Sequence, residues 1–222
     1  FDVSAACAGF CYGVGLAESM VRAGSATNVL VLGVEVLSRY TDVNDRSTAF
    51  LFSDGAGAVV VGPSDVAAIG PTVWGSKPEA ARVIEIDDWR GVDPEVGAHI
   101  HMDGREVFKW ATTAIVQKAV ETLEASGLTP DELDCFIPHQ ANIRMIDFIA
   151  KKFDYPKERF LLNLDRCGNT SSASVALVLA ENMNNGVIKP GDLVLTMGFG
   201  GGLSRRTPGS FGGAGAYQPL AR

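Results

Sequence analysis

Short apolar runs alternate with helix-like amphipathic patterns along most of this chain. A helical pattern at 8–22 precedes an apolar run at 28–36, and a run at 134–137 precedes a helical pattern at 141–153. Strands joined by helical crossovers usually lie parallel in a sheet that helices cover on both faces. We therefore predict an α/β fold with buried, mostly parallel strands.

The other predicted elements continue this alternation. A long amphipathic helix is expected at 106–126, because apolar residues recur there at helical spacing. Two comparable strand-to-helix units, around Cys7 and His139, indicate two related halves, which we place at 1–69 and 70–204. Further strands are expected at 54–62, 66–74, 82–86, 160–164 and 192–198, with a further helix at 171–184.

The composition excludes several classes of protein. Nineteen Lys and Arg against 26 Asp and Glu give a net charge of −7, whereas a sequence-independent nucleic-acid binder needs a basic surface. No apolar run approaches the roughly 20 residues of a membrane helix. The four cysteines show no two-residue gap of a zinc or redox motif. We expect a cytoplasmic protein without a metal, a nucleic-acid partner or a membrane anchor.

The two ends of the chain differ from its body. The chain starts at Phe1 inside an apolar segment, without Met or a signal peptide, which indicates a cut end. Residues 205–222 hold four Gly, two Pro and three Arg but no acidic residue. That composition predicts a disordered tail, for which an altered reading frame is one origin.

Cys7 is the sharpest chemical feature. It lies between a strand that ends at Ser4 and the helix expected at 8–22, so its sulfur would sit at a helix N-terminus. The helix dipole and the free N–H groups there favour a thiolate over a thiol. Its neighbours are Ala and Gly, which leave space for a substrate. The alternative is a buried structural cysteine.

Three further loops, each directly after a predicted strand, carry polar or Gly-rich segments. His139 lies at the edge where open α/β sheets bind ligands, although a solvated capping histidine is the alternative. Asn169 either caps the helix at 171–184 or presents its amide to a ligand. The glycines at 200–202 can expose backbone N–H groups as an oxyanion hole.

Together these segments resemble the motifs of the 3-oxoacyl-(acyl-carrier-protein) synthase III family, in the thiolase superfamily. The resemblance holds from Phe1 to about Ser204 and implies a thiolase-like layered αβαβα fold of two related halves, the first incomplete. It also implies a homodimer when the protein is full length. The matching motifs are AACAGF at 5–10, PHQAN at 138–142, GNTSSAS at 168–174 and GFGGG at 198–202.

The resemblance implies a condensation that proceeds in two steps. The Cys7 thiolate would attack an acyl-CoA to give an acyl-enzyme, and malonyl-acyl carrier protein would then lose CO₂ and attack the acyl group. His139 and Asn169 would donate hydrogen bonds to the malonyl thioester carbonyl. The backbone N–H groups of Cys7 and Gly201 would stabilise the acyl oxyanion. No metal or redox cofactor is implied.

The resemblance also assigns binding residues. Arg105 stands where the family often has Asn, so this contact departs from the pattern. The predicted CoA and pantetheine contacts are Arg46, Gly104, Phe108, Asn142 and Arg144. The predicted docking residues for the acidic carrier protein are Lys109, Arg144, Lys151 and Lys152; the last three share one helix face, and an ordinary solvated face is the alternative.

Two other functions stay open. A related enzyme that loads starter units for polyketide-type products would carry the same Cys-His-Asn set. A chain that lacks the family's segment before Cys7 and its usual final strand could also be an inactive fragment that only binds CoA or a partner. Acyl transfer to Cys7 distinguishes the enzymes from the fragment.

Overall fold

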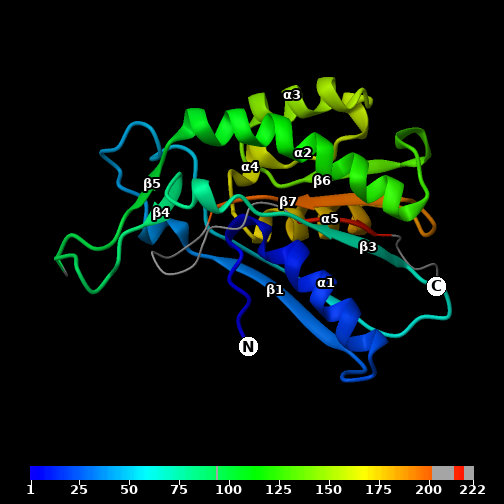
Figure 1. Ribbon diagram of the computed structural model, residues 1–222. Coiled ribbons are helices and arrows are strands. Elements are labelled where there is room, and N and C mark those ends of the chain that lie inside the picture. Colours follow the sequence, from blue (N-terminus) through cyan, green and yellow to red (C-terminus); the bar gives the residue numbers. More distant parts are fainter. Residues whose placement is uncertain (94, 202–212, 218–222) are drawn as a thin grey trace.

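In the computed structural model, residues 1–93, 95–201 and 213–217 are described, and they form layers of helices and strands (Figure 1). None of the helices in these ranges is long and apolar enough to span a membrane. The helices are α1 (Gly9–Arg22), α2 (Gly104–Ser126), α3 (Ile143–Phe153), α4 (Leu164–Cys167) and α5 (Ala173–Asn184). The strands are β1 (Val29–Glu35), β2 (Gly55–Val61), β3 (Ile69–Trp74), β4 (Ile84–Ile86), β5 (Ile100–Met102), β6 (Cys135–Pro138), β7 (Val194–Gly198) and β8 (Gly213–Tyr217).

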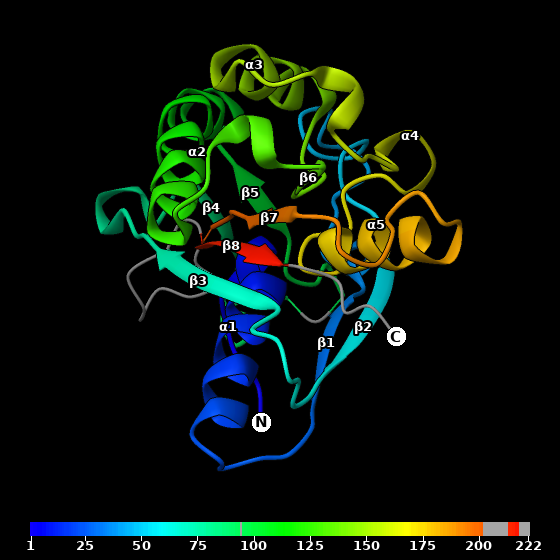
Figure 2. The ribbon, with the colours of Figure 1, turned by 90° about the vertical axis from the view of Figure 1, so that its right-hand side faces the viewer.

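The largest sheet has four strands in the order β3-β8-β7-β6 (Figure 2). Strands β6 and β7 are parallel, while β8 runs antiparallel to both β7 and β3. The pairs β1–β2 and β4–β5 are antiparallel as well. The layered α/β fold is thus confirmed, but the prediction of mostly parallel strands is wrong.

The connection between β1 and β2 explains part of this difference. A parallel return needs a long crossover, usually a helix, to carry the chain back to the same sheet end. Residues 36–54 are long enough for such a crossover, but they form only the 3-10 helix Leu37–Arg39, turns and a single bridge of Phe52 to Asn169. No helix in this range carries the chain across, and β2 pairs antiparallel with β1. This segment instead carries Phe50, Leu51 and Phe52 toward the cavity described below.

Strand β1 is buried on one face only. Val31 is 7% exposed, whereas Leu30 and Leu32 are 59% and 60% exposed. Helix α5 covers the buried side of the β1–β2 pair, and a Cβ added at Gly57 would lie 2.7 Å from the Cβ of Ala176. The prediction that this strand is buried on both faces is wrong for the described residues, because none of them covers the face that carries Leu30 and Leu32. The unbroken apolar run prompted that prediction.

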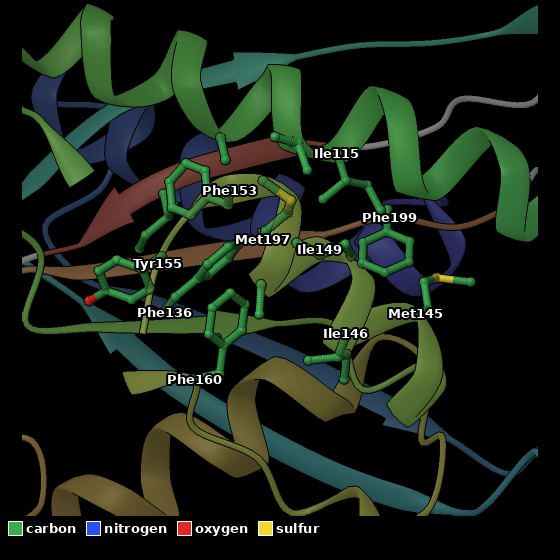
Figure 3. Packing of buried hydrophobic residues seen from close by; sticks show 14 of the residues in the cluster. Ile115, Phe136, Met145, Ile146, Ile149, Phe153, Tyr155, Phe160, Met197 and Phe199 are labelled. Carbon is green, nitrogen blue, oxygen red and sulfur yellow. The ribbon is translucent and has the colours of Figure 1, made fainter. Parts of the chain in front are cut away.

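The main hydrophobic core lies around β6 and β7, against α2 and α3 (Figure 3). The fully buried ring of Phe136 has its centroid 4.8 Å from that of Phe160 and 5.7 Å from that of Phe153. Met145 and Phe199 belong to this core and also line the cavity. The core therefore supports one wall of the candidate site directly.

Helices α2 and α3 begin at capping residues. The Asp103 carboxylate accepts hydrogen bonds from the backbone N–H groups of Arg105 and Glu106, both at 3.1 Å. The Asn142 amide oxygen accepts from the N–H of Arg144 at 2.9 Å. Since such caps satisfy free N–H groups of the first turn, they fix where each helix starts. The predicted helices at 106–126 and 141–153 are confirmed within two residues.

The strand predicted at 160–164 is wrong. Only Phe160 pairs with β6, through a single bridge to Phe136. The backbone N–H of Asn163 donates to the Gln140 side-chain oxygen at 3.2 Å, and the chain then enters α4. The Gln140 side-chain oxygen thus takes the place of the β6 carbonyl that would accept this bond in a continued strand. Strand β5 was also missed, because it is only three residues long within a polar stretch.

Part of the predicted tail forms a strand. Gly213–Tyr217 is β8, which lies between β3 and β7 and pairs with both. The prediction of disorder is wrong for these five residues, because composition cannot distinguish a Gly-Ala strand from a linker when its stability comes from two neighbouring backbones. The rest of the predicted tail from Arg205 lies outside the described residues.

Candidate active site

Cys7 lies where the chain turns into α1. It is the middle residue of a 3-10 helix (Ala6–Ala8) that leads directly into α1, and Ala6 has a left-handed φ of 46°. The Gly run passes closely behind it, since a Cβ added at Gly200 would lie 2.7 Å from the Cys7 Cβ and 3.0 Å from its sulfur. Only glycine allows the backbone to approach the cysteine this closely.

The pKa of Cys7 shifts in the direction opposite to the one predicted. Burial raises it from 9.0 to about 11, and the nearby Glu35 carboxylate adds to the rise. The Ser171 hydroxyl, whose oxygen lies 3.3 Å from the sulfur, acts in the opposite sense. The prediction that the helix N-terminus yields a thiolate is wrong, because burial disfavours the charged sulfur by more than the hydrogen bonds to it favour that form.

His139 follows β6 and is only 2% exposed. Its backbone N–H donates to the Met197 carbonyl at 2.7 Å. The rings of His139 and Phe199 pack edge to face, with their centroids 5.1 Å apart. The Nδ1 atom lies 2.7 Å from the Ser174 hydroxyl oxygen. Burial lowers the pKa of His139 to about 3, so the imidazole is neutral at physiological pH. The alternative of a solvated capping histidine is wrong.

Asn169 lies in the corner before α5 and is 6% exposed. Its backbone N–H donates to the Leu51 carbonyl at 3.2 Å, which joins this corner to the β1–β2 connection. Its side-chain oxygen accepts from the Ser171 N–H at 2.9 Å. This contact occupies the acceptor end of the amide and leaves the NH₂ end as the one that can donate to a ligand.

A single cavity of about 580 Å³ brings these predicted residues together. Cys7, His139 and Asn169 all line it, as does Gly201. They come from four separate corners of the chain, as the sequence indicates. The other walls are mainly apolar and include Leu37, Tyr40, Phe50, Leu51, Phe52, Ile84, Ile86, Trp89, Ile100, Met102, Val107, Trp110, Met145 and Phe199.

The predicted CoA contacts are divided between the cavity and the surface. Gly104, Phe108 and Asn142 line the cavity. Arg46 and Arg144 are exposed and are not part of its wall. Arginines outside an apolar cavity can bind the charged end of a long ligand whose other end lies inside it. The positions of Arg46 and Arg144 therefore agree with their predicted contacts to CoA.

The four predicted docking residues lie on two adjacent helices. Lys109 is on α2, and Arg144, Lys151 and Lys152 are on α3; all four are exposed. Both views show α2 and α3 side by side (Figures 1 and 2), and Lys152 donates to the Thr112 carbonyl of α2 at 3.2 Å. The basic residues therefore belong to one surface, which we call the α2–α3 basic surface.

Three site residues were missed by the sequence analysis. Ser171 and Ser174 lie within the quoted GNTSSAS segment but were given no role, although they contact Cys7 and His139. Glu35 lines the cavity, and its carboxylate accepts from the hydroxyl of Ser172 at 2.6 Å. A single acidic residue at the end of an apolar run was the available signal. Among the residues described, no cluster of three potential metal ligands is found.

Comparison with known proteins gives consistent matches along the chain. Residues 1–78 match the family model of 3-oxoacyl-[acyl-carrier-protein] synthase III, and residues 123–207 match the model of its C-terminal part. A β-ketoacyl-[acyl-carrier-protein] synthase III of Streptomyces coelicolor is 47% identical over 218 residues, covering 91% of this chain. The chain spans only 64% of that relative's length.

Two solved structures have the same fold. The β-ketoacyl-[acyl carrier protein] synthase III of Thermus thermophilus is 38% identical with a TM-score of 0.88, over 98% of this chain and 67% of the solved one. The priming β-ketosynthase of the R1128 polyketide biosynthetic pathway is 40% identical with a TM-score of 0.90, over 99% of this chain and 65% of the solved one. The thiolase-like fold predicted from the motifs is confirmed.

Proposed function

The chain belongs to the 3-oxoacyl-[acyl-carrier-protein] synthase III family, and on this basis we propose that it carries the site of a decarboxylative Claisen condensation. The substrates are an acyl-CoA primer and malonyl-acyl carrier protein. The products are 3-oxoacyl-acyl carrier protein, CoA and CO₂, so the reaction starts fatty-acid synthesis. The observation that carries the proposal is the meeting of Cys7, His139 and Asn169 in one cavity.

The first half-reaction forms an acyl-enzyme. The Cys7 sulfur attacks the thioester carbonyl, the carbon–sulfur bond to CoA breaks, and the thiol proton leaves with the CoA sulfur. Because the resting thiol is protonated, its proton has to pass to the CoA sulfur during the attack, so that the leaving group departs as a thiol. The N–H groups of Cys7 and Gly201 stabilise the negative charge on the acyl oxygen.

The second half-reaction needs hydrogen-bond donors. Loss of CO₂ from the malonyl group places negative charge on its thioester oxygen, and the resulting enolate carbon attacks the acyl-Cys7 carbonyl. The carbon–sulfur bond to Cys7 then breaks, and the Cys7 sulfur takes a proton from solvent to return to the resting thiol. A neutral His139 imidazole and the Asn169 amide can both donate to that oxygen. The Asn169 side-chain oxygen already accepts from the Ser171 N–H, and Nδ1 of His139 already lies 2.7 Å from the Ser174 hydroxyl oxygen. Neither residue has to change its charge during the step.

The binding roles complete the proposal. Gly104, Phe108 and Asn142 contact the pantetheine arm inside the cavity, while Arg46 and Arg144 contact the charged end of CoA. The α2–α3 basic surface docks the acidic carrier protein. We also propose a cytoplasmic homodimer and a division of the chain into halves at residue 70. No cofactor besides the substrates is needed.

Acyl transfer to Cys7 tests the proposal. The purified chain is incubated with radiolabelled acetyl-CoA, digested, and analysed for label on the peptide that contains Cys7. We expect label in the native chain and none in Cys7→Ala, because only a nucleophilic sulfur can form the thioester. Binding of CoA without any label would support the alternative of an inactive fragment.

Polyketide priming is the second candidate, because the R1128 priming β-ketosynthase has nearly the same backbone. The two candidates differ in the partner that supplies the extender unit. Product analysis with malonyl groups on a fatty-acid carrier protein and on a polyketide carrier protein separates them. A clear preference for the polyketide carrier would overturn fatty-acid initiation while leaving the chemistry at Cys7 unchanged.

A further inference from the structure

The hydrogen bonds around Ser174 constrain the proton on His139. Ser174 is 1% exposed, lies in the first turn of α5 and is not part of the cavity wall. Its hydroxyl oxygen lies 2.7 Å from Nδ1 of His139 and accepts from the backbone N–H of Gln140 at 3.3 Å. The Nδ1 edge of the ring therefore faces α5, and the opposite edge, with Nε2, is the one available to the cavity.

The direction of the bond to His139 follows from counting protons. A serine hydroxyl has one proton to donate, whereas the backbone N–H of Gln140 can only donate. Among the described residues, the side chain of Ser174 has no other acceptor than Nδ1 of His139. If Nδ1 carried the proton instead, the buried hydroxyl would receive two donors and its own proton would be left unpaired, which is costly.

We propose that Ser174 is a positioning residue that holds His139 as the tautomer with its proton on Nε2. The hydroxyl donates to Nδ1, so the ring presents a donor, and no acceptor, to the cavity. This makes His139 suited to donate to the malonyl thioester oxygen and unable to take the proton of Cys7 in the resting state.

Gln140 ties this arrangement to the surrounding fold. Its side chain is fully buried, donates to the Pro138 carbonyl at 2.7 Å and accepts from the Asn163 N–H at 3.2 Å. These bonds fix the turn that carries both His139 and the N–H that points at Ser174. The Ser174 oxygen thus has a fixed acceptor role toward Gln140, which leaves its proton for His139.

Nitrogen NMR of the ring tests the tautomer without any substrate. In protein labelled with ¹⁵N-histidine, the protonated and unprotonated ring nitrogens resonate at different positions, and His139→Gln assigns the signals among the three histidines. We expect the native chain to show the proton on Nε2. We expect Ser174→Ala to show a mixture of both tautomers, and Ser174→Thr, which keeps the hydroxyl, to restore the native pattern.

The matched control is Ser126→Ala. Ser126 donates a hydrogen bond to the Thr122 carbonyl at 2.8 Å at the end of α2. This variant should leave the His139 signals unchanged. A native chain with the proton on Nδ1, or a folded Ser174→Ala that keeps it wholly on Nε2, would overturn the role of Ser174.

The catalytic consequence rests on the proposed function. Ser174→Ala should lower malonyl decarboxylation about ten- to hundredfold while Cys7 acylation changes less than about twofold. Equal loss in both half-reactions would overturn the positioning role in favour of a general structural one. A native chain that shows the expected tautomer but no decarboxylation would refute the proposed function and leave the assignment of Ser174 intact.

Discussion

At the scale of single residues, Cys7 and His139 show opposite pKa shifts with the same cause. Burial disfavours charge, so it raises the pKa of the thiol to about 11 and lowers that of the imidazole to about 3. The resting site therefore contains a neutral thiol beside neutral donors. It differs from the thiolate–imidazolium pairs of other cysteine enzymes, in which charge is present before the substrate arrives.

The protonated thiol predicts an unusual pH dependence of Cys7 alkylation. Because its pKa is raised, the thiolate fraction is small at pH 7 and increases about tenfold per pH unit until the pH approaches 11. Iodoacetamide should therefore label Cys7 at a rate that still rises between pH 9 and pH 10. Mass spectrometry of the Cys7 peptide measures this rate.

A cysteine thiol with its ordinary pKa of 9.0 provides the comparison. A short unstructured peptide spanning residues 5–10 contains Cys7 without the cavity around it, and its alkylation rate should level off above pH 9. If the folded chain levelled off at or below that pH, burial would not control this thiol.

His139→Ala should separate the two half-reactions. Removing one donor to a developing oxyanion typically lowers the rate about 10²- to 10³-fold, so malonyl decarboxylation should fall by this factor. Cys7 acylation should fall less than about tenfold, because in the proposed mechanism the acyl oxygen is bound by backbone donors and not by His139. Ser126→Ala, at the end of α2 and outside the cavity wall, is the control and should change neither rate. Equal losses in both half-reactions would contradict the assigned roles.

At the scale of secondary-structure elements, α5 connects the strand layer to the site. Its first turn carries Ser174. Ser172, the residue before the helix, donates hydrogen bonds from its backbone N–H and its hydroxyl to the Glu35 carboxylate at the end of β1. Further along, α5 lies directly on Gly57 of β2. A shift of α5 would therefore move the partners of His139 and Cys7 together.

Gly57→Ala tests the closeness of this contact. The new Cβ would lie 2.7 Å from the Cβ of Ala176 and 3.2 Å from the nitrogen of Leu177, so either the helix or the strand must move. Such overpacking typically lowers the free energy of unfolding by about 1–3 kcal/mol. Urea denaturation measures the change. Gly91→Ala, whose new Cβ would meet nothing closer than 3.6 Å, should change it by less than about 1 kcal/mol.

The sequence predicted the corners better than the sheet. Residue type and position were enough to place Cys7 at the start of a helix, His139 after a strand and Asn169 in the turn before α5, because small residues, capping residues and Gly runs act locally. The strands expected directly before Cys7 and before Asn169 do not form. Strand direction and the pairing of β8 depend on distant backbones, and a local pattern carries no information about them. The sign of the Cys7 pKa shift was missed for the same reason, since desolvation comes from walls that several remote segments build.

At the scale of the whole molecule, a negative net charge coexists with a local basic surface. The chain carries −7, yet Lys109, Arg144, Lys151 and Lys152 lie exposed on two adjacent helices. Phe108 of α2 lines the cavity and its ring lies 6.0 Å from that of Phe148 on α3, centroid to centroid. A partner that docks on the α2–α3 basic surface would therefore lie beside the helix that forms part of the cavity wall.

Charge reversal on this surface gives the last prediction. Lys109→Glu combined with Lys151→Glu should raise the KM for malonyl-acyl carrier protein about three- to tenfold with little change in kcat, because neither side chain lines the cavity. The KM for malonyl-CoA, which has no protein partner, should stay unchanged. The effect should largely disappear at about 1 M salt, where the Debye length is about 3 Å. Lys77→Glu combined with Lys189→Glu reverses two exposed lysines outside α2 and α3, so this variant changes the net charge by the same amount and is the control. An equal rise in that variant would show that overall charge, rather than this surface, controls the encounter with the carrier protein.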